Sequence, residues 1–161
     1  MTLRADILMR LLFDYTNPLD LTTGRERDAY TLLQRVTDGT GSGRARWIFF
    51  DQVSLAPAET ASFAFNGAGV EDIHGRLIDF ALVNLVIVRN RTTTAGNYAY
   101  ISACPGTKPL IWTSGTAPRV WANGIIRGRS PAGRTTGASK TLTIVGGVGT
   151  NVVDVVAMGS N

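Results

Sequence analysis

The feature that most constrains the fold is a series of short apolar runs separated by joints rich in glycine, proline and asparagine. In order, the runs are AYTLLQRV (29–36), ARWIFFDQVSL (45–55), TASFAF (60–65), LIDFALVNLVIVRN (77–90), YAYISA (98–103), PLIWT (109–113), RVWANGIIRG (119–128), KTLTIVGG (140–147) and NVVDVVAMG (151–159). Period-two alternation is typical of half-buried strands. Strands at this spacing predict an all-β sandwich or barrel.

Two segments of this series carry more specific expectations. The run 77–90 is the most apolar in the chain and reads as a central strand. The segment GVEDIHGRL (69–77) fits either a short helical turn or the tip of a hairpin. No segment requires a helix longer than a turn or two, so the expected fold class stays all-β.

Composition supports strands over helices and a single domain over several. Charged residues make up 17% of the chain, below the usual value of about 25%, and 18 residues are glycine. Lysine is nearly absent, although lysine is one of the residues that dominate helical surfaces. At 161 residues without a long linker, we expect one β-sandwich domain over 1–161, with 1–28 as a possible N-terminal strand or arm.

The N-terminal segment LRADILMRLLFDY, Leu3 to Tyr15, alternates over an unusual length. Its odd-numbered positions are all apolar, whereas most of its even-numbered positions are charged. This pattern predicts a strand, and the apolar face needs a partner sheet. Two alternatives remain open: the strand is exchanged between subunits by strand addition, or it is an internal strand of its own sandwich.

The glycine-rich stretch VTDGTGSGRARWIFFDQ (36–52) does not fit a phosphate-binding loop. Such a loop needs Gly, four residues, and then Gly-Lys-Ser/Thr ahead of a helix, and neither this stretch nor GRTTGASKT (133–141) has that spacing. We therefore predict that TDGTGSG is a turn between two strands of the sandwich. The strand RARWIFF leaves it, with Trp47 and Phe49 on one face and Ile48 and Phe50 on the other.

Residues able to carry catalysis are sparse. His74 is the only histidine, and Cys104 is the only cysteine and precedes a proline. No nucleophile elbow accompanies His74, and a zinc site needs more ligands than one Cys and one His. We expect no enzyme activity, no cofactor and no metal site. Cys104 is expected to pack as a small apolar residue. The chain carries no signal peptide and no apolar stretch of about 20 residues, so we expect synthesis in the cytoplasm.

The net charge of +4 comes almost entirely from arginine. Arginine is favoured at interfaces because its planar fork pairs with carboxylates and stacks on aromatic rings. Only weak, non-specific nucleic-acid binding is expected from so small a charge. The candidate partner-contact residues are six arginines and two tryptophans: Arg25, Arg27, Arg89, Arg91, Trp112, Trp121, Arg127 and Arg129.

The order of these pieces resembles small virion proteins of tailed bacteriophages. The stretches that carry the resemblance are LLQRVTDGTGSGRARWIFFDQVSLAPAETASFAFNG (32–67), VEDIHGRLIDFALVNLVIVRNRTT (70–93) and LTIVGGVGTNVVDVVAMGSN (142–161). Together these stretches contain a turn, an aromatic strand, a long apolar strand that ends in Asn and Thr, and a final pair of strands. The segment from Pro105 to Arg134 departs from this pattern.

The resemblance implies an antiparallel β-sandwich of jelly-roll type in a head decoration (cement) protein. Such a protein binds the outer surface of the major capsid shell and stabilises it, so the expected location is the virion surface and the expected partner is the major capsid protein. Tail or fibre-base components are the first alternative, and a nucleic-acid-binding β-barrel is the second. The resemblance and the many large apolar residues predict a homotrimer rather than a homodimer. No catalytic residues are implied.

Overall fold

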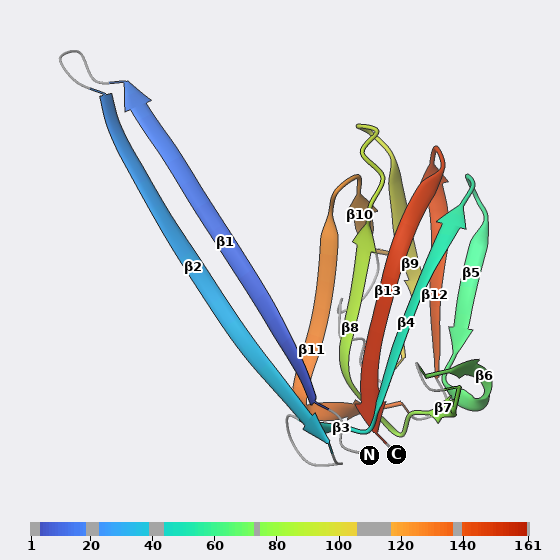
Figure 1. Cartoon of the computed structure of the whole chain (residues 1–161). Coiled ribbons are helices and arrows are strands. Elements are labelled where there is room, and N and C mark those ends of the chain that lie inside the picture. Colours follow the sequence, from blue (N-terminus) through green and yellow to red (C-terminus); the bar gives the residue numbers. More distant parts are fainter. Residues whose placement is uncertain are drawn as a thin grey trace.

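A computed structural model describes residues 4–18, 23–38, 44–72, 75–105, 117–136 and 140–160. Every regular element within these residues is a β-strand, and the sheets pack against each other as a sandwich (Figure 1). The prediction of an all-β, antiparallel sandwich is therefore confirmed. His74, Trp112 and the predicted strand PLIWT lie outside the described residues.

Two four-stranded sheets form the sandwich, and all of their strand pairs are antiparallel. One sheet has the order β11-β8-β13-β4 and consists of β11 (Ile125–Thr135), β8 (Leu82–Asn90), β13 (Asn151–Ser160) and β4 (Trp47–Leu55). The other has the order β10-β9-β12-β5 and consists of β10 (Arg119–Trp121), β9 (Tyr98–Ala103), β12 (Thr141–Val148) and β5 (Thr60–Ala64). We call these the β8 sheet and the β9 sheet.

The pairing of the eight sandwich strands follows a single long ribbon. The first of the eight pairs with the last (β4 with β13), the second with the seventh (β5 with β12), the third with the sixth (β8 with β11) and the fourth with the fifth (β9 with β10). Two further ladders, β8 with β13 and β9 with β12, join the ribbon to itself. Successive strand pairs of the ribbon thus alternate between the two sheets.

The predicted strand 77–90 is interrupted. Its first part is β7 (Leu77–Asp79), which pairs with β6 (Asn66–Glu71) in a small separate hairpin, and its second part is β8. The break falls where Phe80 enters the core and its backbone N–H bonds to the carbonyl of Phe65. Of the two interpretations of 69–77, the antiparallel β6–β7 pair agrees with the hairpin, although residues 73 and 74 at its tip lie outside the described residues. Beside the tip, the Asp72 carboxylate accepts hydrogen bonds from the backbone N–H and the side chain of Arg76.

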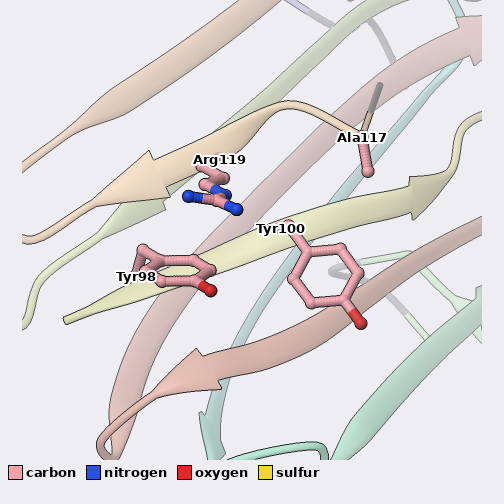
Figure 2. A pocket seen from close by; sticks show the side chains of 4 residues that line it. All are labelled: Tyr98, Tyr100, Ala117 and Arg119. Atoms are coloured by element: carbon pink, nitrogen blue, oxygen red, sulfur yellow. The ribbon is translucent and has the colours of Figure 1, made fainter. Parts of the chain in front are cut away.

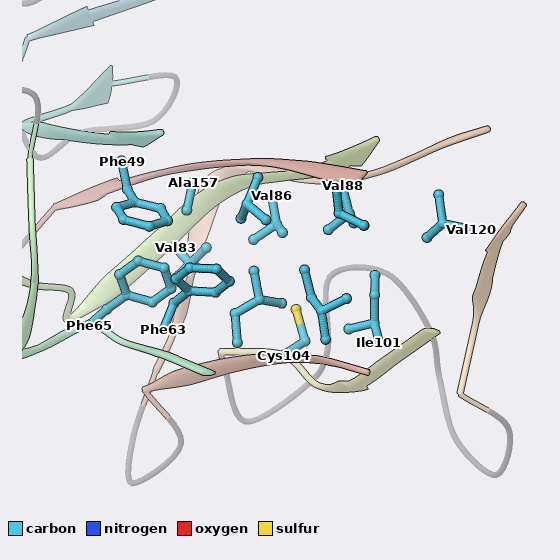
Figure 3. Packing of buried hydrophobic residues seen from close by; sticks show 14 of the residues in the cluster. Phe49, Phe63, Phe65, Val83, Val86, Val88, Ile101, Cys104, Val120 and Ala157 are labelled. Atoms are coloured by element: carbon cyan, nitrogen blue, oxygen red, sulfur yellow. The ribbon is translucent and has the colours of Figure 1, made fainter. Parts of the chain in front are cut away.

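The core lies between the two sheets and is rich in aromatic and branched residues (Figure 3). Phe65 is fully buried, and its ring lies 5.3 Å from that of Phe49 and 4.9 Å from that of Phe80. Cys104 is buried in the same cluster and forms no disulfide, and it packs as a small apolar residue, as predicted. Phe49 faces this core while its neighbour Phe50 is exposed, so the two-faced interpretation of RARWIFF is confirmed.

The N-terminal part of the chain, from Arg4 to Asp38, forms a long hairpin outside the sandwich. β1 (Arg4–Pro18) pairs antiparallel with β2 (Thr23–Asp38) over its full length, and β2 pairs in parallel with the short β3 (Arg44–Ala45). Figure 1 shows the hairpin leaning away from the sandwich, with the end where β1 stops and β2 starts farthest from it.

This hairpin confirms one prediction and corrects another. The N-terminal segment is a strand, but it is not an internal strand of the sandwich, because its sheet contains only β1, β2 and β3. TDGTGSG begins within β2, which is a strand of the hairpin and not of the sandwich, and its residues 39–43 lie outside the described residues. Turn-forming residues indicate where a strand ends but not which sheet it joins. The segment expected as a possible strand or arm, 1–28, includes β1 and the start of β2, which continues to Asp38.

A buried amide network closes one end of the sandwich. The Asn90 side chain is fully buried, and its Nδ2 donates to the Val120 carbonyl (3.1 Å) and to Oδ1 of Asn151 (2.8 Å). Its Oδ1 accepts from the backbone N–H of Thr92 at 3.1 Å. Asn90 therefore connects strands from both sheets at this end.

Replacing Asn90 by alanine is expected to lower the unfolding free energy by about 2–4 kcal/mol, because buried partners would lose their hydrogen bonds. Asn66→Ala is the matched control. That side chain is exposed and makes a single bond, to the backbone N–H of Ala68, so its loss should cost less than about 1 kcal/mol. Urea unfolding curves of the two variants measure the difference, and equal losses would contradict the assigned role of Asn90.

Candidate functional site

The eight predicted partner-contact residues do not form one surface. Arg25 and Arg27 are in β2, at ladder positions opposite Thr16 and Asp14 near the outer end of the hairpin. Arg89, Arg91, Arg127 and Arg129 belong to the β8 sheet or its edge, and Trp121 is in the β9 sheet. Trp112 lies outside the described residues.

The outer face of the β8 sheet brings three of the predicted arginines together. Arg89 is exposed, and Arg127 lies on the same face opposite Ile87. Arg91 follows the end of β8, and its Nε lies 3.8 Å from Oδ2 of Asp154. The Asp154 carboxylate also accepts a hydrogen bond from Nε2 of Gln52 at 2.6 Å. The end of the face at Arg89, Arg91 and Asp154 is polar, with a surplus of positive charge, and Arg127 lies one row closer to the middle of the sheet.

The other end of the same face is apolar. Leu85 and Met158 are buried on it in a small cluster, and Ile48, Ile87 and Val156 pack against that cluster while staying half-buried. Phe50, which pairs directly with Val156, completes this apolar strip and is 56% exposed. Exposed apolar surface of this kind marks interaction sites in soluble proteins.

The outer face of the β9 sheet carries an aromatic cluster with one arginine. The rings of Tyr98 and Trp121 lie 5.0 Å apart, because the β9–β10 ladder sets these residues directly opposite each other. The Arg119 guanidinium lies over the Tyr98 ring at 4.7 Å from its centroid and 5.9 Å from that of Trp121. Trp121 remains 50% exposed. Stacked arginine and aromatic groups of this kind form a rigid platform with both apolar area and charge.

A shallow hollow adjoins this platform. It is lined by Tyr98, Tyr100, Ala117 and Arg119 and has a volume of about 220 Å³ (Figure 2). Typical small-molecule sites are larger, at roughly 300–1,000 Å³. The hollow is therefore better suited to one anchoring side chain of a macromolecular partner than to an enclosed small ligand.

Gly147 in β12 makes room for the platform. A Cβ at this position would collide with the ring of Tyr98, so the ring can lie flat against the sheet only because the residue beneath it is glycine. We call the three residues Tyr98, Arg119 and Trp121 the β9 platform. Trp121 was predicted from the sequence, but Tyr98, Tyr100 and Arg119 were not.

A signal for the tyrosines was present. In YAYISA the alternation sets Tyr98 and Tyr100 on the face opposite to Ala99 and Ile101, which are fully buried. Two tyrosines on the outer face of a strand are more than solubility requires. No local pattern, however, indicated that Arg119 and Trp121 would lie beside them, because β9 ends at Ala103 and β10 begins only at Arg119.

Within the residues that the structure describes, no group of three or more His, Cys, Asp or Glu side chains could hold a metal ion. The same residues include no helix long and apolar enough to cross a membrane. The absence of enzyme activity and of a cofactor remains a prediction. A scan against protein-family models and a search of curated proteins both return no match to the chain.

Proposed function

We propose that this chain is a structural virion protein of a tailed bacteriophage, a decoration protein that binds the outside of the major capsid shell and stabilises it. The observation that carries the proposal is the β9 platform, a Tyr-Trp-Arg cluster on the outer face of a sandwich whose described residues hold no cluster of metal-ligating side chains. Trp, Tyr and Arg are the residues most enriched among those that dominate protein–protein binding energies. The resemblance of 32–161 to small virion proteins supplies the kind of partner.

The sandwich itself fits this class. A jelly roll is an eight-stranded, two-sheet structure built from two Greek keys. Rolling up one long antiparallel ribbon, with pairs one-eight, two-seven, three-six and four-five, produces such a structure. The ladders β4–β13, β5–β12, β8–β11 and β9–β10 follow this rule, so we infer a jelly roll with the β6–β7 hairpin inserted between its second and third strands.

One copy would bind the shell through this platform with modest affinity, whereas many linked copies on the same shell would bind with high avidity. A small Tyr-Trp-Arg surface supplies a few kcal/mol, and each exposed arginine pair adds only ~0–1 kcal/mol. Many copies on one shell, connected to one another, convert weak contacts into high avidity. A homotrimer would suit the threefold positions of a shell, and the trimer remains a prediction.

Tail or fibre-base components are the alternative within the same class, and they would use the same platform on a different partner. A nucleic-acid-binding role has one observation in its favour, because single-strand binders also combine aromatic rings with arginine. The sheets nevertheless form a sandwich rather than a closed barrel, and the platform holds one arginine. We expect little retention of nucleic acid in filter binding at near-physiological salt.

The proposed function predicts that the purified chain co-sediments with shells of the major capsid protein from which the decoration protein is missing. Binding should also raise the temperature at which those shells rupture. Trp121→Ala should weaken the affinity of one copy for its site on the shell roughly 30-fold, which corresponds to a loss of about 2 kcal/mol at a residue that dominates binding. Leu77→Ala is the matched control, because Leu77 is similarly exposed (53%) but lies on β7, away from the platform.

The two parts of the proposal fail separately. If the wild-type chain does not bind any such shell, the virion role is wrong. If the wild-type chain binds but Trp121→Ala binds equally well, the role stands and the platform is not the contact surface.

A further inference from the structure

The β1–β2 hairpin is amphipathic across both of its strands. Residues directly opposite in an antiparallel ladder belong to the same face. The ladder therefore adds Val36, Leu32 and Tyr30 to the face that carries the odd-numbered apolar residues of β1. That face contains Ala5, Ile7, Met9, Leu11, Val36, Leu32 and Tyr30, with Gln34 as the one polar residue in these rows.

The other face of the hairpin is mostly polar and carries more arginines than acidic residues, with Arg4, Arg10 and Arg25 opposite threonines. On it Asp6 is opposite Arg35, and Asp14 is opposite Arg27. Opposite charges directly across a ladder are favourable. This face is thus suited to water, whereas the odd-numbered face is suited to an apolar surface.

Such a hairpin needs a cover. Two-stranded hairpins are at best marginally stable alone in water, and packing of an apolar face is what stabilises them. β1 has 15 residues, so the arm extends roughly 50 Å at about 3.4 Å per residue. In Figure 1 it diverges from its own sandwich along this length, and its own β8 sheet does not cover it.

The outer face of the β8 sheet also has apolar surface that no described residue of the same chain covers fully. Its apolar strip of Phe50, Ile87 and Val156 is exposed or half-buried and is continuous with the buried pair Leu85 and Met158. The strip needs an apolar partner of the kind that the hairpin's odd-numbered face offers, and a sheet packed on a sheet is a common way to bury both.

The charges of the two faces also match, and they set a direction. Toward the outer end of the hairpin, the odd-numbered face turns acidic, with Asp28 opposite Phe13 and Glu26 opposite Tyr15. Along the β8 sheet, the apolar strip gives way to the exposed Arg89 and then to Arg91. A hairpin laid along the sheet with apolar rows on the strip directs its acidic end toward these arginines.

We infer that the odd-numbered face of the β1–β2 hairpin packs on the outer face of the β8 sheet of a second copy of this chain. The contact is face to face, so it differs from the exchange of a single strand into a sheet edge, which the continuous β1–β2 ladder makes unnecessary. Each copy offers one hairpin and one sheet, so two copies can pair reciprocally, and head-to-tail contacts form a ring where the rotation between copies closes.

The test uses the full chain alone, without shells, so its outcome is independent of the virion role. Size exclusion with light scattering should show the wild-type chain as a closed oligomer at micromolar concentration. Phe50→Asp on the sheet and Met9→Asp on the hairpin should each shift the chain to the mass of a monomer, with the β-type far-UV circular dichroism spectrum retained.

Two matched controls place the same charge elsewhere. Leu77→Asp introduces it at a residue as exposed as Phe50 but outside the β8 sheet, and Leu12→Asp introduces it on the polar face of the same strand as Met9. Both controls should associate as the wild type does.

Mixing the two defective variants separates a contact between copies from general damage. The Phe50→Asp chain keeps an intact hairpin, and the Met9→Asp chain keeps an intact sheet, so together they should form a one-to-one complex. A monomeric wild type, as would follow if each hairpin covered its own sheet, overturns the inference. So does association of Phe50→Asp and Met9→Asp at wild-type strength, or a mixture that stays monomeric.

Discussion

Replacing Phe65 by alanine is expected to lower the free energy of unfolding by about 3–5 kcal/mol, a large share of the stability of a domain of this size. The ring is fully buried and contacts the rings of Phe49 and Phe80 at centroid distances of 5.3 and 4.9 Å. Its removal takes apolar area out of the core and leaves a cavity between the two sheets that neighbouring strands cannot close. Urea unfolding followed by tryptophan fluorescence measures the loss, because Trp47 packs against this core.

Leu77→Ala is the control for this experiment. Leu77 is 53% exposed at the start of β7, and its truncation should change the unfolding free energy by no more than about 0.5 kcal/mol. A loss below about 1 kcal/mol for Phe65→Ala would mean that the three rings do not form the centre of the core. The packing of the two sheets would then need another explanation.

The strands were largely predictable because alternation is a local property. Tyr98–Ala103 begins and ends as the sequence indicated, and the burial of Phe49 beside an exposed Phe50 follows from period-two geometry alone. The burial of Cys104 was also predicted, since a lone cysteine usually packs as a small apolar residue. Strand existence and facing are decided within a few residues, and the sequence contains that information.

Strand pairing was not predictable, because it depends on residues far apart in the chain. Nothing within Leu3 to Tyr15 shows that its partner is β2, or that this pair stays out of the sandwich. The same limit explains the site. Tyr98 could be assigned to an outer face, but its neighbours Arg119 and Trp121 come from a strand whose pairing is set by the rolled ribbon.

The two outer faces of the sandwich suggest a division of roles. The β9 platform presents aromatic rings and one arginine in a compact group, which suits a single partner bound at one spot. The β8 sheet presents a longer apolar strip that ends in Arg89 and Arg91, which suits an elongated partner such as the hairpin. Association through one face would leave the other free to bind a shell, so both contacts can exist in the same assembly.

Removing residues 1–38 is expected to leave a folded sandwich that no longer associates. The cluster between the sheets is built from residues between Phe49 and Ala157, so the described core survives the loss of both hairpin strands. Without the arm, the β8 sheet of each copy loses its partner, and an oligomer should become a monomer. Far-UV circular dichroism and light scattering on the shortened chain measure folding and mass together.

A shorter deletion, of residues 1–16, supplies the contrast. It removes nearly all of β1 but leaves β2, whose long unpaired edge and apolar residues Tyr30, Leu32 and Val36 would then lack the ladder that satisfies their backbone groups. Unpaired strands of this kind pair with other chains without limit, so this variant should aggregate where the longer deletion stays soluble. If the chain without 1–38 is unfolded, the hairpin is part of the folding core after all. If it is folded and still forms the wild-type oligomer, the hairpin is not the element that joins the copies.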